Sequence, residues 1–256
     1  MQDNGNRTAK PIDGFKVLKP ATCGRKKIMA KLVIFRHGQT EFNAKKLMTG
    51  QADVPLTDLG KEQAHKAGKA MKHISFDKVY SSNLSRAHET ASRALDHTEK
   101  NDHLKKECGN WDIEQRVEII ERDTGDFTGR KHQEDPEILA HPRDYETPLP
   151  NGESIKETVE RVEEFFINDV IPRLEAGENV LIVCHAGIVR AFDIILGDAE
   201  KEFGSKVSIL NATPVVHSYE DGKRIKRITL DVETGVSNDN KPVPKTICKP
   251  KPPKFN

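Results

Sequence analysis

Two short runs of apolar residues dominate the hydrophobic pattern of the chain. Residues 31–35 read KLVIF and residues 180–184 read VLIVC, almost without polar interruption. Such continuous runs are typical of parallel strands that are covered on both faces. Each run continues directly into a short motif with a histidine, His37 after the first and His185 after the second. The pattern therefore predicts two buried strands that each deliver a histidine.

Amphipathic stretches around these strands predict helices. One opens near Thr57 with apolar side chains at helical spacing, and another covers about residues 84–96. Ser154 and Glu157 form a capping-box pattern at the start of a third helix, which should run to about Leu174. Strands that alternate with helices predict a layered α/β domain with helices on both faces of the sheet.

A turn signal near the end of the chain predicts a β-hairpin. Asp221-Gly222 separates residues 214–220 from residues 224–230, and glycine tolerates the positive φ of a tight turn. In layered α/β domains, ligands bind beyond the carboxyl ends of the strands. This rule places His37 and His185 where a ligand is expected.

The length of 256 residues suits one large α/β domain. We assign residues 29–234 to this domain. Residues 1–28 are polar and net basic, which predicts a flexible extension, with a targeting peptide as the alternative. Prolines and lysines in residues 235–256 predict a disordered tail, with a polyproline II ligand as the alternative.

Composition narrows the classes of partner. With 41 basic and 40 acidic residues the formal charge is +1, which offers no global field for nucleic acid. No run approaches the ~20 apolar residues of a membrane span. Four dispersed cysteines form no CxxC pair, and the ten histidines show no HExxH spacing. We therefore expect a cytoplasmic protein without metal or cofactor; a homodimer stays open.

Five residues could together carry phosphoryl transfer. His37 can present a ring nitrogen to phosphorus as a nucleophile. Arg36 and Arg86 offer planar cationic forks that match phosphoryl oxygens. His185, if protonated, adds a third cationic donor, and Glu121 can protonate the leaving alcohol and then deprotonate the attacking water.

Each of these residues also has an ordinary structural explanation. A histidine at a strand end is commonly a hydrogen-bonded structural residue. Arg86 taken alone would be a surface residue of a helix, and Glu121 could belong to a solvated charged face with its neighbours. Only the combination points to chemistry.

The combination resembles the histidine phosphatase superfamily, which includes cofactor-dependent phosphoglycerate mutases. The resemblance covers about residues 31–220 and implies a phosphoglycerate mutase-like, three-layer α/β/α sandwich with a mostly parallel central sheet. The motifs that carry it, in order, are LVIFRHGQTEFNAKKLMTGQADVPLTDLGKEQA, SSNLSRAHETA, ERDTGDFTG, PNGES and VLIVCHAGIVRAF.

The resemblance also implies roles for single residues. His37 would be the phosphorylated histidine and Glu121 the proton donor and acceptor. Arg36, Arg86 and His185 would form the phosphate pocket. The substrate-binding positions that the motifs imply are Gly38, Thr40, Asn43, Thr49, Gly50 and Gly187.

Three departures from the mutase pattern favour water as the phosphoryl acceptor. Thr124 stands where mutases have the tyrosine of an ERxYG motif, residues 130–149 are a short covering segment, and the HAG at 185–187 resembles the phosphatase branch. We therefore predict a hydrolase that acts through a phosphohistidine on small phosphorylated metabolites. A 2,3-bisphosphoglycerate-dependent phosphoglycerate mutase and a non-catalytic phospho-ligand binding protein are the alternatives. Candidates for holding a second anionic group are Lys45, Lys46, Arg130 and Lys131.

Overall fold

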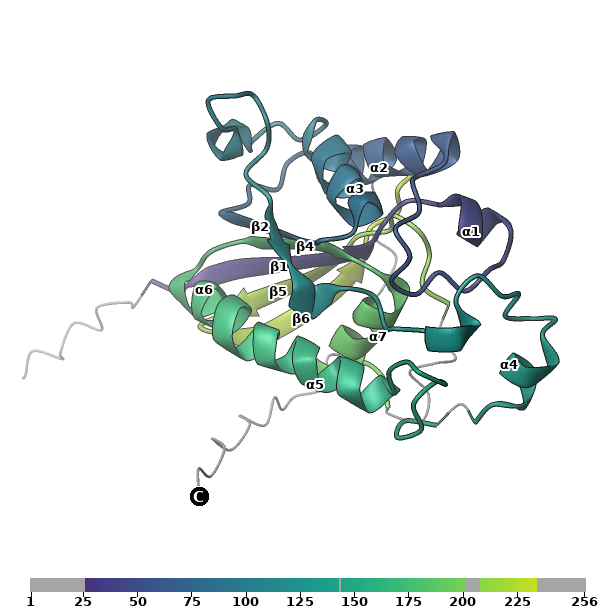
Figure 1. The fold of residues 1–256 in the computed structure, drawn as a ribbon. Helices are drawn as coiled ribbons and strands as arrows, with labels where there is room; N and C mark the ends of the chain where they lie inside the picture. Colours follow the sequence, from purple (N-terminus) through teal and green to yellow (C-terminus); the bar gives the residue numbers. More distant parts are fainter. Residues whose placement is uncertain (1–25, 143, 201–207, 234–256) are drawn as a thin grey trace, which may run out of the picture.

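A six-stranded mixed sheet forms the centre of the protein (Figure 1). The computed structural model describes residues 26–142, 144–200 and 208–233, so the predictions for residues 1–25 and 234–256 lie outside the described residues. In the order β3-β2-β4-β1-β5-β6, the first four strands are parallel, while β5 and β6 run antiparallel to their neighbours. The strands are β1 (Met29–Arg36), β2 (Lys78–Ser82), β3 (Glu114–Arg116), β4 (Val180–Cys184), β5 (Val215–Glu220) and β6 (Lys223–Thr229).

Helices cover both faces of this sheet, so the predicted α/β/α sandwich is confirmed. Helices α2 and α3 lie on one face, and α5, α6 and α7 lie on the other (Figure 1). Along β1, Leu32 and Ile34 join one buried core while Val33 and Phe35 join the other. The helices are α1 (Glu41–Ala44), α2 (Asp58–Ala70), α3 (Ser85–Leu95), α4 (Pro136–Ala140), α5 (Ile155–Phe165), α6 (Ile171–Ala176) and α7 (Ala186–Ile195). Short 3-10 turns are η1 (Asp102–Leu104), η2 (Val117–Ile119) and η3 (Gly125–Phe127).

The helix predicted from Ser154 to about Leu174 begins as expected but is not continuous. The Ser154 hydroxyl accepts the backbone N–H of Glu157, whose carboxylate accepts the N–H of Ser154, so the capping box is confirmed. Between α5 and α6 the chain forms a π-helical turn, η4 (Phe166–Val170). Pro172 has no N–H to donate to the carbonyl four residues earlier, which explains why the regular α-helical pattern breaks there.

The C-terminal hairpin has the turn that its sequence predicts. Asp221 and Gly222 both have positive φ, 50° and 73°, as a type I′ turn requires. Asp221 also binds the start of β1, because its carboxylate accepts the N–H of Ile28 and its own N–H donates to the Ile28 carbonyl.

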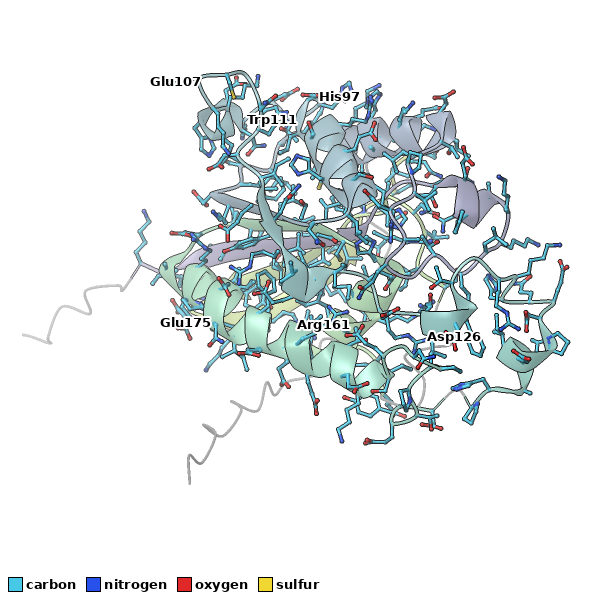
Figure 2. All side chains as sticks on the ribbon, in the orientation of Figure 1. His97, Glu107, Trp111, Asp126, Arg161 and Glu175 are labelled. Carbon is cyan, nitrogen blue, oxygen red and sulfur yellow. The ribbon has the colours of Figure 1, made fainter. Side chains whose placement is uncertain are left out.

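Charged side chains also lie on the exposed surfaces of the helices, as Glu175 on α6 illustrates (Figure 2). None of the helices in the described ranges is both long and apolar enough to cross a membrane.

Candidate active site

Adjacent parallel strands bring the two predicted site histidines together. In the register of β1 and β4, Arg36 lies opposite Cys184, and the backbone N–H of His37 donates to the Cys184 carbonyl over 2.9 Å. His37 and His185 therefore leave the same edge of the sheet. Their ring centroids lie 5.1 Å apart, and both side chains are buried.

Arg86 reaches the same place from the other side of β4. It stands in the first turn of α3, directly after β2, and is fully buried. Its two terminal nitrogens donate to the carbonyls of Ala52 (2.6 Å) and Gly50 (2.9 Å), and its Nε lies 3.3 Å from Nε2 of His37. These bonds fix the guanidinium group against the ring of His37.

The ring of His37 is held in one neutral tautomer. Its Nδ1 lies 2.6 Å from the carbonyl oxygen of Gly38, which can only accept, so Nδ1 carries the proton. Nε2 is then unprotonated, and its lone pair accepts a hydrogen bond from Arg86. Burial, with the charges of Arg36 and Arg86, holds the pKa of His37 well below its usual 6.5.

Arg36 and His185 complete a buried cluster of nitrogen groups. Arg36 donates to the Ile209 carbonyl, and burial lowers its pKa to about 10, which leaves it charged at neutral pH. Burial and the charge of Arg86 hold the pKa of His185 well below 6.5, so the ring is neutral at neutral pH in the protein alone. Neither ring nitrogen of His185 has a hydrogen-bond partner among the described residues.

Glu121 lies at the N-terminus of α7. Its carboxylate accepts the N–H of Gly187 (3.1 and 3.3 Å to the two oxygens) and the N–H of Arg122 (2.9 Å). The helix dipole favours an anion at this end. A Cβ at Gly187 would lie 2.4 Å from Oε1 of Glu121, so only glycine lets the carboxylate approach.

Arg36, His37 and Glu121 face a cavity of about 750 Å³. Its outer wall comes from the cap, a name we use for residues 124–142 and 144–151, which includes α4. The cap hydrogen-bonds to the loop at Met48, where Met48 and residues 129–130 exchange backbone bonds. Arg86 and His185 do not line the cavity and lie buried behind its wall. The predicted residues that do line it are Arg36, His37, Asn43, Thr49, Gly50, Glu121 and Gly187.

Two predicted substrate-binding residues have other positions. Gly38 does not line the cavity; a Cβ there would lie 2.2 Å from the carbonyl oxygen of Gly60, so this glycine permits a close backbone crossing. Thr40 is fully buried and does not line the cavity either. Its hydroxyl caps α1 by accepting the N–H of Asn43. Both residues shape the loop that carries the site.

Sequence reasoning missed several polar residues of the cavity wall, among them Arg122, Arg190 and Asn211. Arg122 follows Glu121 in a charged stretch whose sequence is equally typical of a solvated face. Arg190 stands one turn into α7, and its position five residues after His185 was an available signal. Asn211 donates to the His37 carbonyl over 2.9 Å, for which the sequence gives no signal. No group of three His, Cys, Asp or Glu side chains within the described ranges could hold a metal ion.

Comparison with known families and curated proteins gives consistent matches. The model of the histidine phosphatase superfamily (branch 1) matches residues 32–231. A 2,3-bisphosphoglycerate-dependent phosphoglycerate mutase of Parvibaculum lavamentivorans is 35% identical over 212 residues, which cover 79% of this chain and 96% of that protein. The protein of the same name from Methylorubrum extorquens is 34% identical over 209 residues, covering 78% and 94%.

Solved structures of similar fold include both mutases and phosphatases. A phosphoglycerate mutase from Bacillus anthracis has a TM-score of 0.62 and 25% identity, covering 77% of this chain and 90% of that one. A mycobacterial glucosyl-3-phosphoglycerate phosphatase in complex with VO3 has a TM-score of 0.58 and 26% identity, covering 73% and 92%. A putative alpha-ribazole-5'-P phosphatase from Escherichia coli has a TM-score of 0.58 and 25% identity, covering 86% and 98%.

We predict that His37 stays neutral, with its proton on Nδ1, when the pH falls from 7.5 to 6.5. The reason is that burial and two arginines lower its pKa well below 6.5, and protonation begins only as the pH approaches that lowered value. Imidazole ¹⁵N NMR of the labelled protein measures this directly, with His37→Gln to assign the resonance. A protonated Nε2 at pH 6.5 would contradict the prediction.

We predict that Gly187→Ala displaces the carboxylate of Glu121 and slows turnover roughly tenfold or more, within the range that general acid–base catalysis contributes. Phosphate release from a phosphomonoester measures the effect. Gly109→Ala is the control, because a Cβ at Gly109 meets no atom within 4 Å, and its positive φ of 83° makes alanine there more strained in backbone than at Gly187. Unchanged turnover in Gly187→Ala would show that this contact does not matter.

Proposed function

This chain belongs to branch 1 of the histidine phosphatase superfamily, and we propose that it hydrolyses small phosphomonoesters through a phosphohistidine at His37. The observation that carries the proposal is the nucleophile itself. Nε2 of His37 is unprotonated, is held 3.3 Å from Nε of Arg86, and belongs to a ring that lines the cavity. An anionic phosphoryl group in the cavity would meet this lone pair between buried cations.

In the first step, Nε2 of His37 attacks phosphorus and the bond from phosphorus to the ester oxygen breaks. The carboxylate of Glu121 takes up the proton of a monoprotonated phosphomonoester and passes it to the leaving oxygen. In the second step, Glu121 takes a proton from water, whose oxygen attacks the phosphohistidine and releases inorganic phosphate. Arg36 and Arg86 balance the charge of the phosphoryl oxygens. His185 lies behind the cavity wall with its ring 5.1 Å from that of His37, and from there the negative charge of a bound phosphoryl group would favour its protonation.

The cap supports water as the acceptor because its cations are already paired. Arg130 makes two hydrogen bonds to Asp135 (2.7 and 2.8 Å) and one to Glu137, and Lys131 binds Glu134 over 2.8 Å. Neither Arg130 nor Lys131 lines the cavity. Of the four residues considered for a second anionic group, Lys46 alone does so. A bisphosphorylated or carboxylated substrate would therefore find little free charge on the described part of the cap.

Apolar side chains line the same part of the cavity. Leu139 on α4 is 52% exposed, and Phe127, Ile138 and Leu149 form a small cluster with Met48 beneath it. Such a wall suits an uncharged organic group on the leaving oxygen. We therefore assign the substrate class as phosphomonoesters with an uncharged, partly apolar leaving group.

A phosphoglycerate mutase is the second candidate, and the curated relatives favour it. The alignment to the Parvibaculum mutase takes up 96% of that protein with 79% of this chain. That relative aligns over nearly its whole length, which supports the mutase reaction as the alternative. The distinction rests on Thr124 and on the paired cations of the cap.

We predict that the purified protein releases phosphate from p-nitrophenyl phosphate faster than it interconverts 2- and 3-phosphoglycerate, with or without 2,3-bisphosphoglycerate. His37→Ala should abolish both reactions because it removes the nucleophile. Phosphate release and coupled enolase assays measure the two rates. Rapid interconversion with little phosphate release would select the mutase, and no turnover of a broad substrate set would select a binding protein.

We predict that Leu139→Asp raises the KM for 1-naphthyl phosphate roughly fivefold or more, with a smaller change for glycerol phosphate. Loss of apolar contact and the added negative charge both disfavour the larger apolar group. Leu59→Asp is the matched control, because Leu59 is similarly exposed (49%) but lies on α2 and does not line the cavity. Equal KM changes for both substrates would refute the assigned substrate class.

A further inference from the structure

The segment that carries Glu121 has no regular secondary structure of its own. Residues 121–124 lie between the 3-10 turns η2 and η3 and belong to no helix or strand. A general acid must nevertheless stay within hydrogen-bond reach of the leaving oxygen. Contacts from elsewhere in the fold therefore have to fix this segment.

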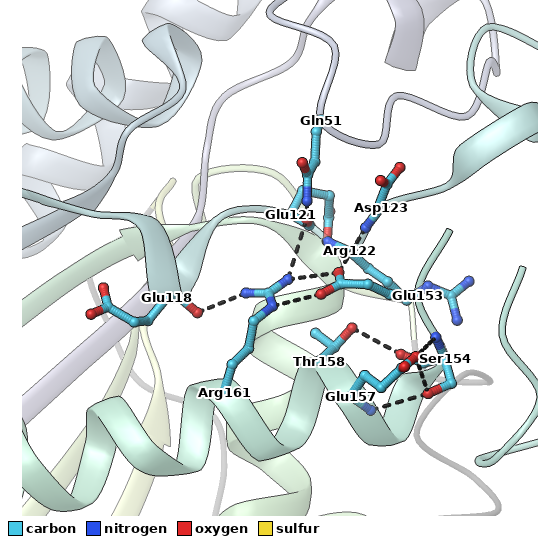
Figure 3. Close-up of polar contacts among 10 residues, drawn as sticks. All are labelled: Gln51, Glu118, Glu121, Arg122, Asp123, Glu153, Ser154, Glu157, Thr158 and Arg161. Atoms are coloured by element: carbon cyan, nitrogen blue, oxygen red, sulfur yellow. Dashed lines mark hydrogen bonds and ion pairs between the residues drawn. The ribbon is translucent and has the colours of Figure 1, made fainter. Parts of the chain in front are cut away.

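Arg161 on α5 supplies the first of these contacts (Figure 3). One terminal nitrogen donates to the carbonyl of Glu118 over 2.7 Å, and the other lies 3.3 Å from the carbonyl of Glu121. Gln51 donates to the same Glu121 carbonyl over 3.1 Å. The backbone is thus held at one carbonyl before the Glu121 side chain and at the carbonyl of Glu121 itself directly after it.

Glu153 supplies the second contact. Its carboxylate accepts from Nε of Arg161 (2.9 Å) and from a terminal nitrogen (3.0 Å), and also accepts the N–H of Asp123 (2.9 Å), as Figure 3 shows. Partial burial raises the pKa of Glu153, but the bonds from Arg161 and Asp123 outweigh it, so the net pKa is lowered and the group is charged.

The PNGES motif gains a physical explanation from this arrangement. A Cβ at Gly152 would lie 2.7 Å from the Asp123 carbonyl oxygen, so glycine allows the motif to pack against the Glu121 segment. The N–H of Glu153 donates to that carbonyl over 3.0 Å, and Ser154 then caps α5, which presents Arg161 two turns later. The motif therefore positions Glu153 directly, and it positions Arg161 through the helix that it begins.

We propose that Arg161 and Glu153 are positioning residues for proton transfer by Glu121. Neither residue lines the cavity, so neither touches substrate. They hold the backbone on both sides of Glu121 so that its carboxylate stays at the N-terminus of α7. This inference rests on the proposed function, because it assigns Glu121 the acid–base role.

The dependence of the rate on the leaving group tests the proposal. A nitrophenolate leaves with little protonation, whereas unsubstituted phenolate needs more help from an acid. We expect Arg161→Met to slow phosphoenzyme formation from phenyl phosphate roughly tenfold more than from p-nitrophenyl phosphate, in single-turnover rapid-quench experiments. Glu153→Gln should show the same selectivity, and Arg161→Lys should recover part of it.

Arg116→Met is the matched control. Arg116 hydrogen-bonds to the side chains of Glu118 in η2 and Asp169 in η4. It therefore links the turn that follows α5 to the segment before Glu121, but it binds none of the carbonyls around Glu121. We expect this variant to lose stability and to slow both substrates equally, if at all. Circular dichroism reports folding of every variant, and Glu153→Gln and Arg161→Lys carry the test if Arg161→Met does not fold.

Glu121→Gln separates the two ways in which the experiment can fail. If Glu121→Gln itself shows no selectivity for the leaving group, the acid role in the proposed function is wrong. If Glu121→Gln is selective but Arg161→Met and Glu153→Gln slow both substrates equally or not at all, the positioning inference alone is overturned.

Discussion

The register of three adjacent parallel strands is the constraint on which the site depends. Strands β2, β4 and β1 end at one edge of the sheet, and the pairing of Arg36 with Cys184 fixes where the chain leaves β1 relative to β4. The bond from the His37 N–H to the Cys184 carbonyl extends that pairing by one residue. A slip of one residue would turn every side chain of β1 to the other face of the sheet, and with it the histidine.

Burial of several cations beside neutral imidazoles requires compensating groups, and the fold provides them from loops. The two terminal nitrogens of Arg86 donate to the carbonyls of Ala52 and Gly50, and its Nε donates to His37. Glu121 lies close enough to favour the charged forms of Arg36 and Arg86, while the N-terminus of α7 stabilises its own charge. The result is that two charged arginines lie beside the unprotonated Nε2 of His37, an arrangement that fits the proposed phosphoryl transfer.

The parts of this arrangement that the sequence predicts are those that local rules govern. The apolar runs at β1 and β4, the capping box at Ser154 and the Asp221-Gly222 turn are local patterns, and the structure confirms each of them. Strand β3 has the sequence EQR, so no hydrophobic period could reveal it. The π-helical turn η4 had a visible cause in Pro172, but a proline predicts a break without its form.

Residues of the site whose roles depend on long-range packing could not be explained from the sequence. The roles of Gly38 and Gly187 depend on which atoms approach them, the backbone of Gly60 and the carboxylate of Glu121, and neither neighbour is close in sequence. Arg122 lies among charged residues, and charge pattern alone does not distinguish a cavity wall from a solvated face. The family resemblance predicts which positions belong to the site, and the contacts in the structure explain why those positions need their residues.

Different kinds of interaction hold the inner half of the cavity and the cap that forms its outer wall. The inner half of the cavity, where Arg36, His37 and Glu121 lie, depends on strand register, buried hydrogen bonds and close contacts at glycines. A single change among these contacts disturbs the packed core. The cap rests on short-range ion pairs such as Arg130 with Asp135 and on a small apolar cluster around Phe127. Exposed ion pairs such as Lys131 with Glu134 contribute little to stability, so they can be exchanged without unfolding the domain. Under the proposed function, substitutions in the cap would redirect the phosphoryl group between water and a second hydroxyl, while His37 in the inner half of the cavity stays the same.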